Sequence, residues 1–141
     1  MGESRSPEVR EVVERLARAL DADDLQTARA LLAGDCAYQS GDRTHRGPDQ
    51  IVDWYAAASA WAHRAFDEVR YDSAVVEVAG ATVTVRFTDY LLKAGGRWHR
   101  HRCLQEFTVG ADGRIARIVH REIPGEREAL AAYLWECGIE R

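Results

Sequence analysis

The sequence lacks the features that tie a chain to a membrane, a disulfide framework or a nucleic acid. Its three cysteines, Cys36, Cys103 and Cys137, are odd in number and widely spaced, which is typical of reduced thiols. No apolar run approaches the roughly eighteen residues that a membrane span needs, and the polar start MGESRSPEVRE lacks the apolar core of a secretion signal. The net charge of -4 gives no general reason to expect nucleic acid or an anionic membrane as a partner. Together these absences predict a cytoplasmic protein.

The overall composition is that of an ordinary globular domain. Of 141 residues, 46% are apolar and 30% charged. A chain of this length buries roughly two thirds of its unfolded surface without help from metal or disulfides. We therefore expect one domain over residues 1–141. No glycine-rich nucleotide-binding motif is visible, and no cofactor is expected.

Apolar residues at helical spacing predict four helices. Capping residues and prolines mark where they begin, and glycines mark where two of them end. The third helix has a broad apolar face, which must lie on a sheet. In chain order, the helices are expected to begin after Ser6–Pro7, to run from Asp23 or Asp24 to a stop at Gly34, to begin at Gly47–Pro48, and to span about 126–137.

The period of the apolar residues changes from 3.6 to 2 near Phe66, which predicts an antiparallel meander. Its strands are joined by short glycine-containing turns. Adjacent valines at Val75–Val76 indicate a β-bulge, a device that bends sheets. A short strand at 36–40 and a turn at 41–43 precede the third helix. The four later strands are expected at about 66–78, 81–93, 97–109 and 114–122.

Strand parity predicts which side chains share the buried face. Val83, Val85 and Phe87 occupy odd positions of their strand, so Asp89 should face inward with them. A three-residue turn at 94–96 then pairs Asp89 with His101. A two-residue turn at Gly95–Gly96 would move Asp89 to the other face, but it would also turn the three apolar residues outward.

The next hairpin extends this inward row. A four-residue turn at 110–113 pairs Cys103 with His120, and His101 with Glu122. Cross-strand neighbours lie close enough for polar side chains to bond. We therefore expect Asp89, His101 and Glu122 in one row, with His120 diagonal to His101.

Three segments carry a resemblance to a known family: ALDADDLQTARALLAGDCAYQSG, THRGPDQIVDWY and GRWHRHRCLQEFTVGADGRIARI. Over about residues 8–124 the chain resembles the nuclear transport factor 2-like fold, within the SnoaL-like polyketide cyclase and ketosteroid isomerase group. The resemblance implies an α+β cone, in which N-terminal helices cover a strongly curved antiparallel or mixed sheet. It also implies a ligand cavity between them, and commonly a dimer.

The catalytic set of ketosteroid isomerase does not carry over. Its carboxylate base falls on Ser40, its tyrosine on Leu16 and its protonated acid on Gln105. All three have been replaced, so the resemblance does not imply steroid isomerisation by that mechanism. The cyclases use a pocket carboxylate as acid or base, for which His120, Glu122 and Asp89 are the local candidates.

The favoured interpretation is a cofactor-independent acid/base enzyme, of isomerase, cyclase or dehydratase type, acting on a small, partly apolar molecule. Histidine titrates near neutrality, and an adjacent carboxylate raises its basicity. The alternative is a non-catalytic ligand-binding or interaction module of the same fold. The expected catalytic residues are His101, His120, Asp89 and Glu122, and the expected substrate-binding residues are Tyr38, Trp54, Tyr55, Phe87, Cys103 and Gln105.

Two further patterns allow other interpretations. The His-x-His spacing is one that zinc enzymes use, but arginines interrupt it and the family rarely binds metal, so no metal is expected. Arginines and aromatics on the outward face, such as Arg100 and Trp98, would suit RNA or a dimer interface. We favour a homodimer through the outer sheet face, because both residue types are enriched at interfaces.

Overall fold

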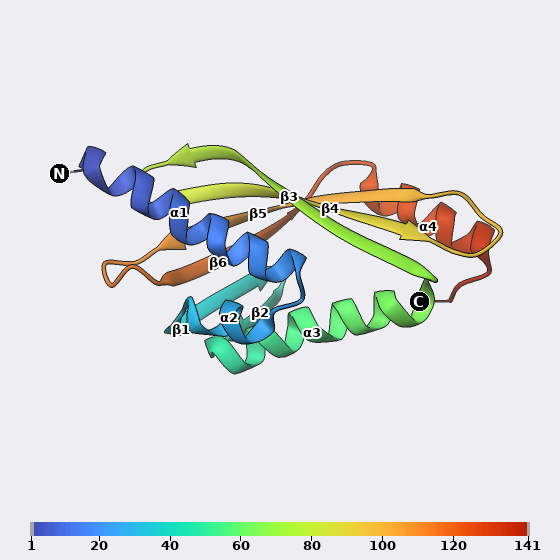
Figure 1. Ribbon diagram of the computed structural model, residues 1–141, viewed down its shortest axis with the longest axis horizontal. Helices are drawn as coiled ribbons and strands as arrows, with labels where there is room; N and C mark the ends of the chain where they lie inside the picture. Colours follow the sequence, from blue (N-terminus) through green and yellow to red (C-terminus); the bar gives the residue numbers. More distant parts are fainter. Residues whose placement is uncertain (1, 141) are drawn as a thin grey trace.

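A computed structural model describes residues 2–140, with side chains from Glu8 onward, and has four helices around one six-stranded sheet (Figure 1). The strand order is β2-β1-β6-β5-β4-β3. All neighbours are antiparallel except β1 and β6, so the sheet is mixed. The elements are α1 (Gly2–Asp21), α2 (Leu25–Ala30), β1 (Leu32–Ser40), β2 (Arg43–Arg46), α3 (Gly47–Ala65), β3 (Glu68–Ala79), β4 (Thr82–Leu92), β5 (His99–Val109), β6 (Ile115–Glu122) and α4 (Glu126–Cys137).

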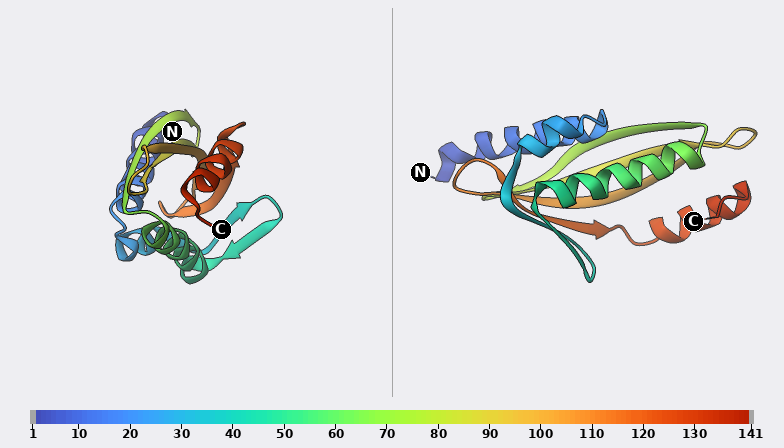
Figure 2. Two further views of the ribbon diagram at one scale, coloured as in Figure 1. Left: turned by 90° about the vertical axis from the view of Figure 1, so that its right-hand side faces the viewer. Right: turned by 90° about the horizontal axis from the view of Figure 1, so that it is seen from below.

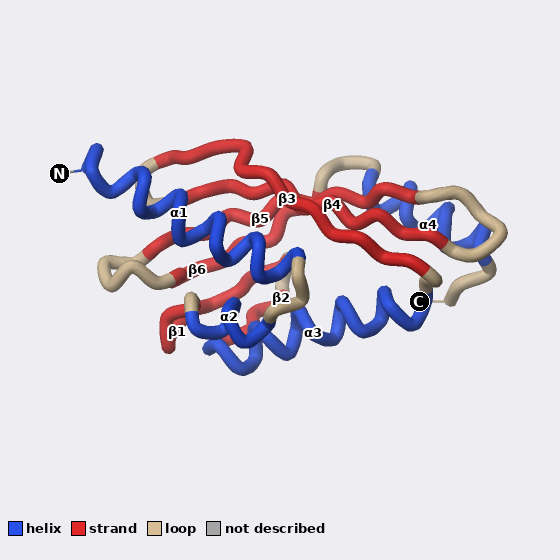
Figure 3. Tube along the Cα trace, in the orientation of Figure 1, coloured by secondary structure: helices blue, strands red, loops and turns tan. Residues whose placement is uncertain are grey.

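The sheet is strongly curved and open, as the end view in Figure 2 makes clear. Long strands run the length of the molecule, with α1 beside one half and α4 at the opposite end (Figure 3). The expected α+β architecture is confirmed. No helix in the described part of the chain is long and apolar enough to cross a membrane.

Two apolar clusters hold the helices on the sheet. The larger one joins α1, α2 and α3 to the inner sheet face and includes Leu16, Ile51 and Phe107, all at most 1% exposed. The smaller one fixes α4 to the end of α3 and to β4, through Tyr133, Phe66 and Leu91. Burying each large apolar side chain contributes roughly 1.5–3 kcal/mol. The inner face is thus apolar at both ends, and its polar residues lie between.

Several predicted boundaries were wrong. Helix α1 begins at Gly2, before the Ser6–Pro7 start. Helix α2 ends at Ala30 and Gly34 lies inside β1, because sheet pairing begins where Ile115 donates to the Leu31 carbonyl (2.9 Å). Strand β2 was not predicted: it is short, polar and exposed at three of four positions, so it has no alternating pattern to detect.

The sheet register confirms two predictions and corrects a third. Asp89 pairs with His101 as expected, and β3 has its bulge between Val75 and Glu77. The predicted β5–β6 register was wrong by two residues. The Gly110 N–H donates to the Arg114 carbonyl in the turn, and the register shifts again between Thr108 and Val109. Cys103 therefore pairs with Glu122, and Gln105 with His120. A shift of two keeps the same face inward but moves both β6 residues along the sheet.

Candidate functional site

The inner face of β4, β5 and β6 is a ladder of side-chain rows. Alternate residues share a face, so successive rows lie roughly 7 Å apart. The row of Val83, Phe107 and Ile118 is fully buried, whereas solvent reaches the third and fourth rows. From one end the rows are Val83–Phe107–Ile118, Val85–Gln105–His120, Phe87–Cys103–Glu122, Asp89–His101 and Leu91–His99.

A hydrogen-bonded group, which we call the amide network, consists of Tyr38, Tyr55, Gln105 and His120. Tyr55 of α3 donates its hydroxyl hydrogen to Gln105 Oε1 at 2.7 Å. Gln105 Nε2 lies 3.2 Å from the Tyr38 hydroxyl and 3.2 Å from His120 Nδ1. Gln105 is only 5% exposed, so these bonds satisfy a buried amide. The network joins α3, β1, β5 and β6.

Counting hydrogens fixes the roles in this network. The amide nitrogen of Gln105 has two hydrogens, one for the Tyr38 oxygen and one for His120 Nδ1. His120 Nδ1 is therefore an acceptor, and the neutral imidazole carries its hydrogen on Nε2. Burial lowers the pKa of His120, an effect that the nearby Glu122 partly offsets, which favours that neutral form.

The two phenols of the network are held neutral. Burial raises the pKa of Tyr38 to about 12, and hydrogen bonds from Trp54 and Gln105 offset part of the effect. Burial also raises the pKa of Tyr55 well above its ordinary value. The Tyr55 hydrogen is used on Gln105, so the donors of the network that could bind an additional oxygen are the Tyr38 O–H and the His120 Nε2–H, the kind of groups that form an oxyanion hole.

Asp89 lies on the same face, two rows from Gln105, and is half-buried. Burial, reinforced by the charge of Asp21, raises its pKa from 3.8 to about 7. None of the described side chains donates a hydrogen bond to it. A carboxyl group that titrates near neutrality can both accept and return a proton. Across from it lies half-buried His101, whose charge interacts with Glu126 of α4.

Tyr71 of β3 lies opposite Asp89 on its other side and belongs to a second chain of hydrogen bonds. The Tyr71 and Ser59 hydroxyl oxygens are 3.0 Å apart, and Ser59 donates to Asp23 at 2.8 Å. His63 Nε2 lies 3.3 Å from the other oxygen of Asp23. We call Tyr71, Ser59, Asp23 and His63 the hydroxyl chain. Sequence reasoning missed it, although Tyr71 shares strand parity with Val69 and Val75.

Cys103 and Phe87 lie between Asp89 and the amide network. Burial, with the charges of Asp89 and Glu122, raises the pKa of the Cys103 thiol to about 12. The thiol is therefore protonated at neutral pH and behaves as a small apolar group. Both side chains are half-buried. They form the apolar middle of the inner face.

Of the other predicted site residues, Glu122 lies away from this arrangement and Trp54 lies at its edge, next to Tyr38 with ring centroids 6.4 Å apart. Glu122 is exposed and lies 3.9 Å from Arg127 of α4, at the end of β6. Its expected pairing with His101 was wrong. Trp54 packs against His45 of β2, with ring centroids 4.6 Å apart. The structure thus brings Tyr38, Tyr55, Gln105 and His120 together, and places Asp89 beside His101.

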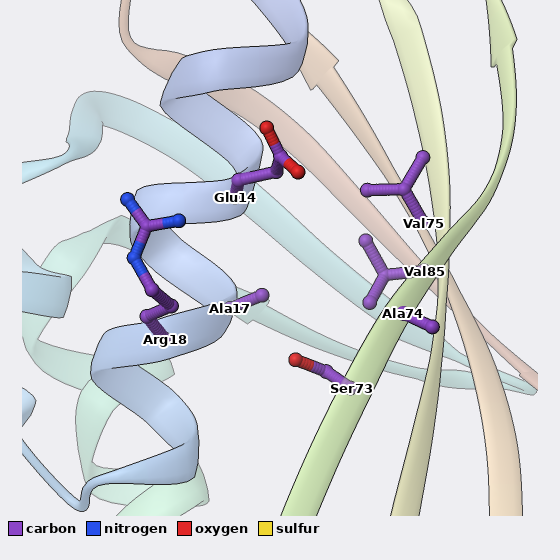
Figure 4. A pocket seen from close by; sticks show the side chains of 7 residues that line it. All are labelled: Glu14, Ala17, Arg18, Ser73, Ala74, Val75 and Val85. Carbon is purple, nitrogen blue, oxygen red and sulfur yellow. The ribbon is translucent and has the colours of Figure 1, made fainter.

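The protein has a hollow that borders the second inner row at Val85 and another on its outer face. One, of about 150 Å³, lies between α1 and β3 (Figure 4). In that view Ala17 points toward the strands, and the guanidinium of Arg18 turns away from them. The other, of about 420 Å³, lies on the outer face around Trp98 and Tyr90. Within the described part of the chain, no three His, Cys, Asp or Glu side chains are grouped to hold a metal ion.

Comparison with known proteins identifies the family and the fold. The family model of the SnoaL-like domain matches residues 13–118, which is most of the chain. The chain belongs to the SnoaL-like family. No curated protein matches this SnoaL-like domain. Helix α4 lies beyond the matched residues.

Solved structures share the fold at low sequence identity. A Sinorhizobium meliloti protein named provisionally as a polyketide cyclase is 22% identical, with a TM-score of 0.63 over 79% of this chain and 94% of that one. A Catenulispora acidiphila protein with a ketosteroid isomerase-like fold, solved in complex with trimethylamine, is 18% identical, with a TM-score of 0.66 over 92% and 94%. An LEH-like epoxide hydrolase of M. tuberculosis is 24% identical, with a TM-score of 0.59 over 94% and 98%. These likenesses establish the nuclear transport factor 2-like fold.

Proposed function

We propose that this SnoaL-like domain binds a small, partly apolar molecule on its inner face and performs cofactor-independent acid/base chemistry on it. The observation that carries the proposal is the half-buried Asp89, whose pKa is raised to about 7 by burial and by Asp21. Perturbed carboxyl groups of this kind concentrate at functional sites. The reaction would be of isomerase, cyclase or dehydratase type.

The remaining residues take supporting roles in this proposal. Asp89 accepts a proton from a carbon or hydroxyl group of the substrate and returns it later. His101, which lies on β5 opposite Asp89, influences the electrostatic environment of Asp89. His120 and Tyr38 bind and polarise an oxygen of the substrate, and Tyr55 holds Gln105 in place. Phe87 and Cys103 contact the apolar body of the substrate. Glu122, being exposed, contributes only its charge.

Hydrogen exchange tests the proposal without knowledge of the natural substrate. A panel of small cyclic and aromatic ketones is incubated with the protein in deuterated buffer, and loss of the α-proton signals is followed by proton NMR. We expect the protein to accelerate exchange for at least one ketone. Asp89→Asn should reduce that acceleration by roughly 100-fold or more, the usual contribution of a general base.

The control variant is Asp53→Asn, an exposed aspartate on α3 that should leave exchange unchanged. Epoxides belong in a parallel panel, because one similar structure is an LEH-like epoxide hydrolase. If compounds bind but none reacts, the protein is a ligand-binding module, which is the second candidate function. If Asp89→Asn reacts as fast as the natural chain, the role of Asp89 is wrong.

We also propose that the protein is a homodimer through the outer sheet face. Two large apolar side chains of β3 and the segment before β5 are exposed there, Val76 at 47% and Trp98 at 41%, and Arg70 lies 5.2 Å over the Trp98 ring. Arginine and tryptophan are enriched at interfaces. Light scattering should give twice the mass of the chain, and Trp98→Glu should halve it. A monomer at micromolar concentration would refute this proposal.

A further inference from the structure

The end of the inner face at the amide network offers hydrogen-bond donors. Gln105 uses its oxygen and both amide hydrogens within the network. The Tyr38 oxygen accepts one of those hydrogens, and His120 Nδ1 accepts the other. Two donors are not used inside the network, namely the Tyr38 O–H and the His120 Nε2–H. A ligand group at this end therefore binds most favourably if it is a hydrogen-bond acceptor.

The end at Tyr71 and Asp89 offers acceptors instead. Ser59 has one hydroxyl hydrogen and donates it to Asp23. Of the two hydroxyls in the Tyr71–Ser59 bond, Tyr71 must therefore be the donor. Because the Tyr71 hydrogen is used in this bond, the Tyr71 oxygen can only accept a further hydrogen bond. Beside it, the Asp89 carboxylate has no donor among the described side chains and is also an acceptor.

Two backbone spacings, one along a strand and one along a helix, indicate how far apart these ends are. On β5, Gln105 and His101 are four residues apart, which is roughly 13 Å of strand. On α3, Tyr55 bonds to Gln105 at one end and Ser59 bonds to Tyr71 at the other. These two helix residues are about one turn apart, which is roughly 6 Å. These two backbone spacings give the order of magnitude of the separation between the ends. The side chains in the interval, Phe87 and Cys103, offer no charge at neutral pH.

We propose that the inner face selects an elongated ligand in one orientation, with a hydrogen-bond acceptor of the ligand at the amide network and a hydrogen-bond donor at Tyr71 and Asp89. The ligand class is a flat or alicyclic molecule with a carbonyl at one end, a hydroxyl at the other and an apolar body. This inference rests on the proposed small-molecule function. It does not require that the bound molecule react.

Three synthetic probes test the orientation. The first is a naphthalene with an acetyl group on one ring and a hydroxymethyl group at the opposite end of the other. The second has methoxymethyl in place of hydroxymethyl and so loses the donor. The third has ethyl in place of acetyl and so loses the acceptor. Binding is followed by probe fluorescence, at a pH about one unit above the pKa of Asp89 so that the carboxylate is ionised.

We expect the first probe to bind roughly three- to tenfold more tightly than either of the others, the effect of one neutral hydrogen bond. Tyr71→Phe removes an acceptor and should reduce the preference for hydroxymethyl over methoxymethyl. Ser59→Ala releases the Tyr71 hydrogen, which can then be donated to the ether, and should reduce the same preference in a protein that keeps Tyr71. His120→Phe should reduce the preference for acetyl over ethyl.

Tyr90→Phe is the matched control, because Tyr90 is on the outer face of the adjacent strand, and it should change no preference. Equal affinity for the three probes, or a tighter methoxymethyl probe, would overturn the inference, and so would absence of binding by all three. Binding with the expected preferences by a protein that turns over none of the ketones or epoxides of the panel would refute catalysis alone. The two proposals can therefore fail separately.

Discussion

Replacement of Asp89 by asparagine should stabilise the protein, and the gain should depend on pH. The substitution keeps the shape of the side chain but removes a carboxyl group that is half-buried near Asp21. In the folded protein that group has a pKa of about 7, against 3.8 for an ordinary aspartate. Folding therefore opposes ionisation of Asp89.

The sign and size follow from linkage. Because the folded pKa is raised, the unfolded chain loses this proton first as the pH rises, and stability falls between about pH 4 and pH 7. At about 1.4 kcal/mol per pKa unit, the full cost is about 4 kcal/mol. Solvent contact and relaxation around a half-buried group reduce it to roughly 2–4 kcal/mol above pH 7. Little of this cost remains near pH 4.

Urea denaturation of the natural chain and of Asp89→Asn, at several values from about pH 4 to pH 8, measures the effect. We expect the difference in the free energy of unfolding to be small in acid and to grow by roughly 2–3 kcal/mol toward pH 8. Asp53→Asn is the control and should show no such trend. A difference that is the same at every pH would refute the claim that folding raises the pKa of Asp89.

Three further predictions concern the rest of the inner face. Gln105→Leu should lower the free energy of unfolding, measured in denaturant titrations, by roughly 2–4 kcal/mol, because it leaves two phenols and an imidazole without their partner. A loss below about 0.5 kcal/mol would show that the network is not important for stability. The His120 imidazole should titrate below the ordinary 6.5 in NMR, so its contribution to stability is complete above that value and is lost as the pH falls; a midpoint at or above 6.5 would contradict its burial. Cys103, with a pKa of about 12, should react with iodoacetamide at neutral pH far more slowly than a free thiol, and equal rates would contradict a protonated thiol.

Strand parity predicted which residues face inward, and for a physical reason. Alternation has a period of two, so one buried valine run such as Val83 and Val85 fixes the face of Asp89. The same alternation predicted that Gln105 and His120 face inward. It could not fix their position along the sheet, because the number of residues absorbed by the turn after Val109 depends on its backbone bonds.

Contacts made by helices were harder to foresee. Helix α3 supplies Tyr55 to the amide network and Ser59 to the hydroxyl chain, and these pairings depend on how the helix crosses the sheet. Apolar periodicity gives the buried stripe of a helix but not its position over the strands. For the same reason Tyr71 was overlooked as a partner of Asp89. The cytoplasmic location stays a prediction from the sequence.

The central claim is that the inner face holds Asp89 half-ionised near neutral pH. A carbon NMR titration of the Asp89 side-chain carboxyl, assigned by the signal that Asp89→Asn removes, measures this directly. We predict a midpoint near 7. A midpoint near 4, the value of an aspartate in water, would contradict the account.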